Sequence, residues 1–194
     1  LCLDDENGTT RAILQSTEDG PAMLLMDEKG QTRARSLVGK VGPVLNVNDE
    51  DGRPRVGLFA GHNEAGIGVY DGNGMSRAVL SMGKEIVSLF LKDEKAKTRT
   101  TLSLDNNGSV FALHDENDKV RADLSVNKDG PSVNIYDDNG ISRGTFFTGK
   151  SGNGIALYDE SGKQRATLGI GKDKYGLNIQ DEDGKIRASL GMKQ

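Results

Sequence analysis

The chain is poor in the residues on which most catalytic and stabilising chemistry depends. Its 194 residues include one cysteine, Cys2, no tryptophan, four prolines and two histidines. A single cysteine excludes an intrachain disulfide, a cysteine zinc cluster and a redox pair within the chain. No run approaches the roughly 18 apolar residues of a membrane-spanning helix, so we expect no direct membrane insertion of this segment.

The net charge and the apolar content limit the possible functions and folds of the chain further. Lys and Arg number 25 against 29 Asp and Glu, for a net charge of -4, which disfavours an overall basic nucleic-acid binder. We therefore expect no nucleic-acid partner. Hydrophobic residues make up only 35% of the chain, whereas glycine occurs 26 times. This balance indicates burial on one side of the structural elements and many turns.

What the chain does have is an internal repeat of 22 residues without insertion or deletion. Each repeat has an aspartate followed six residues later by an arginine, and numbering from that aspartate gives the consensus D-E-x-G-x-x-R-A-x-L. The aspartates are Asp5, Asp27, Asp49, Asp71, Asp93, Asp115, Asp137, Asp159 and Asp181, and the arginines are Arg11, Arg33, Arg55, Arg77, Arg99, Arg121, Arg143, Arg165 and Arg187. Nine such pairs in phase predict one continuous array over residues 1–194.

The hydrophobic pattern within each repeat has a period of two. Positions 19 and 21 are apolar in all nine repeats, and positions 8, 10 and 12 are mostly apolar. This alternation is typical of half-buried β-strands, and the recurring glycines disfavour a helix. A four-residue D-E-x-G turn would pair position 22 with position 5 and place positions 21, 19, 8, 10 and 12 on one face. The sequence therefore predicts an all-β fold of nine strand–turn–strand repeats.

Two architectures share this local pattern. In an antiparallel meander like residues recur every two strands, about 9.6 Å apart, whereas in a parallel single-chain β-solenoid they stack about 4.8 Å apart. Nine aspartates, nine arginines and eight further acids at position 2 would form like-charge ladders at the shorter spacing. The pattern favours the extended antiparallel meander, with the solenoid as the alternative.

A meander leaves one apolar face that something must cover. Identical chains could pack three sheets around an axis as an oligomeric β-prism, or two sheets could form a sandwich. We expect a homo-oligomer, with a trimer favoured. Its core would contain Leu91, Leu113, Ile135 and Leu157.

Catalytic constellations are scarce. The histidines His62 and His114 occupy different repeat positions, and a linear array would keep Cys2 away from His62. Acid pairs recur at positions 1 and 2, but repetition in eight repeats favours a structural role, because an enzyme needs one unusual site. We expect no enzyme activity and no cofactor.

The acids and arginines of the turn each allow a functional interpretation. The oxygen-rich turn of Asp49, Glu50 and Asp51 is a candidate calcium site. The favoured alternative is that each position-1 aspartate caps its turn and pairs with an arginine of its own or a neighbouring repeat. The arginines could bind polyanions as a stripe, but the adjacent acids favour a bracing role.

Tyr70, Tyr136 and Tyr158 share position 22, beside the acidic turn. An exposed tyrosine row could stack on sugars, although cross-strand packing is the commoner role. A binding site would be expected where the repeat is least regular. These places are Asn63-Glu64-Ala65, Gly72 and Ala96.

Over essentially its whole length the chain resembles uncharacterised bacterial β-repeat proteins built from D-E-x-G-x-x-R-A-x-L segments, a likeness that implies no activity. More loosely it is similar to the shafts of cell-surface and bacteriophage fibres. We expect a non-catalytic structural or interaction protein, a rigid rod, spacer or fibre segment, located extracellularly, on a cell surface or on a virion. The alternative is a surface module that binds glycans, cations or a protein partner.

Overall fold

The computed structural model describes residues 1–150, 152–171 and 174–193. The chain divides into two compact units, residues 1–96 and 97–194, each of which is a nine-stranded antiparallel sheet. Residues 151, 172–173 and 194 of the expected array lie outside the described residues. Every regular element within the described ranges is a strand, which confirms the all-β prediction, and none is a helix able to cross a membrane.

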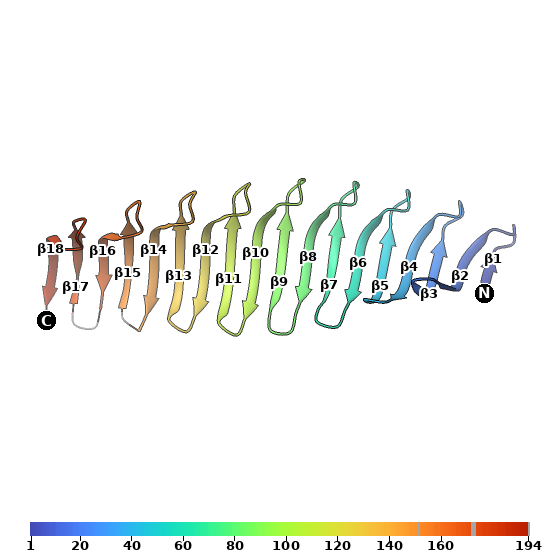
Figure 1. Ribbon diagram of the computed structural model, residues 1–194, viewed down its shortest axis with the longest axis horizontal. Coiled ribbons are helices and arrows are strands. Elements are labelled where there is room, and N and C mark those ends of the chain that lie inside the picture. The colour runs from blue at the N-terminus through green and yellow to red at the C-terminus, as the bar shows by residue number, and fades with distance from the viewer. Residues whose placement is uncertain (151, 172–173, 194) are drawn as a thin grey trace. The chain divides into compact units, whose positions relative to one another are not determined.

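In the N-terminal unit each strand pairs antiparallel with the next along the chain (Figure 1). Its strands are β1 (Cys2–Asp4), β2 (Thr10–Thr17), β3 (Gly20–Met26), β4 (Thr32–Gly39), β5 (Gly42–Asn48), β6 (Pro54–Ala60), β7 (Ala65–Tyr70), β8 (Ser76–Met82) and β9 (Val87–Lys92). One repeat therefore supplies two neighbouring strands.

The C-terminal unit repeats this arrangement. Its strands are β10 (Thr98–Asp105), β11 (Gly108–His114), β12 (Val120–Asn127), β13 (Gly130–Tyr136), β14 (Ser142–Gly149), β15 (Gly152–Tyr158), β16 (Gln164–Ile170), β17 (Lys174–Gln180) and β18 (Ile186–Lys193). Both units are meanders, so the alternative of a parallel single-chain solenoid is wrong. The antiparallel arrangement separates like charges of successive repeats by two strands, about 9.6 Å.

The register at the acidic turn differs from the sequence expectation. Position 22 pairs with position 6, as in Tyr136 opposite Ser142, and not with position 5. Position 21 then pairs with position 8, so the arginine at position 7 is the additional residue of a β-bulge. The turn is one residue longer because the N–H of the aspartate donates to the carbonyl of position 5 in eight turns, as Asp137 does to Ile141 at 3.0 Å. The expected sharing of faces survives, since the bulge restores the parity.

Position 4 of the turn has a positive φ in all nine repeats. Seven of these residues are glycines with φ between 77° and 80°, while Ala96 has φ 60° and Asp118 has φ 63°. Glycine is favoured there because a side chain is strained in this left-handed region. Asp118 makes a compensating contact, since its carboxylate accepts the Thr98 N–H at 2.7 Å.

The two faces of each sheet differ in how far their apolar side chains are covered. We call positions 8, 10, 12, 19 and 21 the apolar face and positions 9, 11, 18, 20 and 22 the polar face. Large side chains on the apolar face are exposed, as shown by Leu45 at 40% and Ile135 at 54%. The buried apolar residues among those described are instead small ones on the polar face, namely Ala22, Ala112 and Ala156. Neither unit therefore buries its large apolar side chains by itself.

Candidate functional surfaces

The edge formed by the acidic turns is organised by the position-1 aspartates, along the upper side of each unit in Figure 1. In the turn of Asp137, one carboxylate oxygen accepts the N–H groups of Asn139 at 2.8 Å and Ile141 at 2.9 Å. The other oxygen lies 2.7 Å from an Arg143 guanidinium nitrogen. The carboxylate thus caps the loop and holds the bulge arginine at the same time.

The same Asp–Arg contact recurs in all eight pairs that lie within one unit. Several arginines also reach the end of the next strand, which belongs to the following hairpin. The Nε atom of Arg55 donates to the Tyr70 carbonyl at 3.0 Å, and that of Arg77 donates to the Lys92 carbonyl at 3.0 Å. A β-bulge re-aims the side chain of its additional residue, which here lets one guanidinium join two successive hairpins.

These contacts hold the pKa of the capping carboxyls below the ordinary value. For Asp5 the largest cause is the hydrogen bond from the Thr9 N–H, and those from Asn7 and Arg11 act in the same direction. For Asp159 the largest cause of the lowered pKa is the hydrogen bond from the Ser161 hydroxyl. The pKa is lowered in the same way for Asp27, Asp49, Asp71, Asp115, Asp137 and Asp181.

At the calcium candidate, the carboxylates already accept hydrogen bonds from the protein. Asp49 accepts the N–H groups of Asp51 and Arg53, and Asp51 pairs with the Arg53 guanidinium at 2.9 Å. Glu50 is an exposed neighbour in the same turn. No group of three or more His, Cys, Asp or Glu side chains in the described part of the chain could hold a metal ion. A cation at Asp49 would have to displace these donors.

Tyr70 and Tyr136, both at position 22, pack against the polar face of their own sheets. Tyr70 covers the cross-strand pair Gly57 and Gly68, because a Cβ added at Gly68 would lie 2.7 Å from the tyrosine oxygen. Phe59 covers Gly66 in the same way, with 2.6 Å between the added Cβ and the ring. Aromatic side chains therefore fill space that glycines leave on β6 and β7.

Tyr136 belongs to a polar network on β12, β13 and β14. Its hydroxyl donates to Asp123 at 2.7 Å, and Asn134 donates to the other carboxylate oxygen of Asp123 at 3.0 Å. The Thr145 hydroxyl in turn donates to the side-chain amide oxygen Oδ1 of Asn134 at 3.0 Å. Burial, reinforced by the Asp123 carboxylate, raises the pKa of Tyr136 to about 12. This network links three strands through side chains alone.

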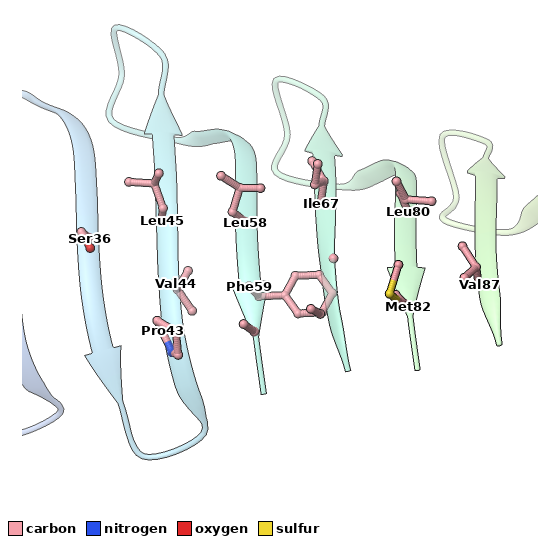
Figure 2. Close-up of a pocket in the computed structure, with 13 residues that line it drawn as sticks. Ser36, Pro43, Val44, Leu45, Leu58, Phe59, Ile67, Leu80, Met82 and Val87 are labelled. Atoms are coloured by element: carbon pink, nitrogen blue, oxygen red, sulfur yellow. The ribbon is translucent and has the colours of Figure 1, made fainter. Parts of the chain in front are cut away.

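The apolar face of the N-terminal unit contains an open depression of about 470 Å³. Leu45, Leu58, Ile67 and Leu80 form a row across four strands there (Figure 2). Ala65, at the irregular connection between β6 and β7, lies at its margin. The lining is almost wholly apolar, so the depression lacks the converging acids and bases that a catalytic site requires.

The remaining candidates stay apart from one another. His114 contacts Thr101, with 3.0 Å between its Nε2 and the hydroxyl oxygen, and lies in the C-terminal unit. His62 is exposed in the turn between β6 and β7, and Cys2 is exposed on β1. Within the N-terminal unit, nothing brings Cys2 to His62.

Sequence reasoning missed the Asp123 network and the apolar depression. Asp123 occupies position 9, where no other repeat has an aspartate, so its departure from the repeat was an available signal. Gly66, which lines the depression, was a second signal, because glycine inside a strand marks close approach of other groups. Both features depend on which residues face each other across neighbouring strands. The bulge makes this pairing different from the one that the sequence predicts.

Comparisons with known proteins supply no family. No protein-family model matches the chain, and no curated protein matches it. A protein from Bacteroides fragilis assigned as a 6-phosphogluconolactonase shares 8% identity over 94% of both chains, with a TM-score of 0.21. The holo PQQ domain of pyranose dehydrogenase from Coprinopsis cinerea shares 7% identity over 88% of this chain and 92% of its own, with a TM-score of 0.17. Both TM-scores are too low to carry an argument about fold or activity.

Proposed function

We propose that this chain is a non-catalytic structural protein, a β-repeat rod, spacer or fibre segment that acts outside the cytoplasm, on a cell surface or on a virion. The observation that carries the proposal is the recurrence of one Asp–Arg contact in all eight pairs that lie within one unit. Each of these turns is braced by its aspartate, and six of the eight arginines also donate to a backbone carbonyl at or just after the end of the next strand. Such nearest-neighbour contacts supply length and stiffness and need no unique site.

Removal of one whole repeat tests this role. Deleting residues 115–136 joins His114 to Asp137 in the same phase and takes away two turns, β12 and β13. We expect the shortened chain to fold, and its maximum dimension in X-ray scattering to fall by about 9.6 Å, the width of two strands. Loss of folding, or an unchanged dimension, would contradict a modular spacer.

A half-repeat deletion is the matched control. Removing residues 115–125 takes out one turn and most of one strand, so it breaks the phase of the apolar face. We expect this variant to fold poorly, although it lacks fewer residues. The contrast would show that whole repeats, and not residue number, define the tolerated step.

A module that binds glycans or cations is the second candidate, and the local contacts favour it less. The Tyr136 hydroxyl already donates to Asp123, and Tyr70 packs on glycines of its own sheet. The Oδ1 atom of Asp49 accepts two backbone N–H groups. The functional groups that a sugar or a cation would contact at these places are therefore engaged in stabilising the repeat.

A further inference from the structure

The apolar face carries no charge in any repeat. None of positions 8, 10, 12, 19 and 21 is Asp, Glu, Lys or Arg in any of the nine repeats. The polar face differs, since it includes Arg35 on β4 and Asp123 on β12. A sheet with two wet faces would not keep one of them free of charge over nine strands in each unit. The pattern indicates that the apolar face is covered in the working protein.

The extent of exposed surface supports this reasoning. Nine strands spaced by 4.8 Å, most of them six to eight residues long, give each unit an apolar face of about 800 Å². A stable interface buries about 800 Å² on each partner, so one unit's face suffices.

The alternation of large and small side chains on the apolar face indicates what kind of partner fits it. Along the row nearest the acidic turns, large side chains at position 21 alternate with position 8, which is Ala or Gly in seven repeats. Ala122 lies between Leu113 and Ile135, which are 45% and 54% exposed. The exceptions at position 8 are Val56 and Thr100. The row therefore consists of protruding side chains at position 21 and gaps over the small residues at position 8. This alternation repeats every two strands, about 9.6 Å.

We infer that the apolar face of each unit is covered by the same face of at least one further copy of this chain, whose large side chains enter the gaps at position 8. A partner must present apolar side chains at the same 9.6 Å interval to fill successive gaps, and this chain has that interval in every row. A lipid surface or an unrelated protein has no reason to match it. The inference concerns assembly and goes beyond the proposed spacer role, so either could fail without the other.

Light scattering of the full chain after size-exclusion chromatography tests whether further copies of the chain cover the apolar face. We expect a mass that is a multiple of 20.8 kDa, with three copies for a prism. Leu80→Asp places a charge on the apolar face of β8 and should weaken assembly at least about tenfold. Ser81→Asp, one residue along on the polar face, is the matched control and should leave the assembly constant within about threefold.

If Leu80→Asp fails to fold by circular dichroism, Leu80→Thr keeps a strand-forming residue and removes most of the apolar contact. A wild-type chain that stays monomeric at all concentrations would overturn the inference. So would a monomer that binds lipid vesicles, or an oligomer that Leu80→Asp leaves unchanged. None of these outcomes would alter the length change expected from deletion of residues 115–136.

A second pair of variants tests whether the gaps are entered. Ala122→Leu enlarges the apolar surface but fills a gap, so meshed faces should dissociate at least about fivefold more readily. Ser36→Leu adds an apolar side chain at position 10, where the other repeats have Leu or Phe, and should strengthen assembly. Stronger assembly of Ala122→Leu would overturn meshing, because it would show that apolar area alone drives association.

Discussion

Glycine has two distinct roles at the scale of the residue. Gly140, in an acidic turn, has φ 80° and nothing within 4 Å of an added Cβ. Gly130, at the opposite end of the strand, has φ 122°, and its added Cβ would lie 2.1 Å from the Thr148 carbonyl oxygen. The first glycine is needed for its dihedral angle, and the second also for close approach of two backbones.

These roles predict different costs of substitution. Gly140→Ala should lower the free energy of unfolding by about 1 kcal/mol, the usual cost of a left-handed alanine. Gly130→Ala should lower it by about 3 kcal/mol or more, because backbone must move as well. Urea unfolding at one fixed protein concentration would measure both values. Equal costs would show that the close approach at Gly130 does not exist in solution.

Tyr136 predicts a response at high pH. Its pKa in the folded protein is raised to about 12 from the ordinary value of 10.0, first by burial and then by Asp123. Stability from the protonated hydroxyl is therefore present below about pH 10 and is lost as the pH rises through about 12. Tyr136→Phe should remove this titration from the ultraviolet absorbance of tyrosinate. Full ionisation of the wild-type phenols near pH 10 would contradict the contact with Asp123.

At the scale of the element, the acidic hairpin turn depends on ionised aspartates. Their pKa values are lowered in the folded protein, so their stabilising effect is present above the ordinary value of 3.8 and is lost as the pH falls through the lowered values. We expect the melting temperature to hold from neutral pH to about pH 5 and to drop steeply below about pH 4. A melting temperature that is flat down to pH 2 would contradict capping by charged carboxylates.

Substitution of one cap separates its two contributions. Asp137→Asn keeps an oxygen for the Asn139 and Ile141 N–H groups but loses the charge facing Arg143. Asp137→Ala removes both contributions and should lower the melting temperature more than Asp137→Asn does. Differential scanning calorimetry would rank them. Equal losses would mean that the capping hydrogen bonds contribute little.

The sequence predicts the strands and turns, but it does not predict the residue-by-residue pairing between strands. The 22-residue interval and the period of two were enough to predict strands, acidic turns and a common face for positions such as those of Leu113 and Ile135. The pairing of Tyr136 with Ser142 was not foreseen, because the fifth turn residue and the arginine bulge follow from backbone hydrogen bonds. The Asp123 network depends on that register and was therefore missed as well.

At the scale of the whole molecule, no described contact covers the large side chains of the apolar faces. Leu91, Leu113, Ile135 and Leu157, the expected core, are between 43% and 54% exposed. Burial of such side chains is the main source of folding free energy. If further copies supply it, folding and association are coupled, and stability must depend on the concentration of the chain.

The unfolding midpoint as a function of protein concentration tests this central claim most directly. With urea as denaturant, a hundredfold increase in chain concentration should shift the midpoint upward, and Ile135→Asp should weaken both the midpoint and its dependence on concentration. A midpoint that is independent of concentration, together with a monomeric mass throughout, would contradict the claim that copies of this chain cover its apolar face.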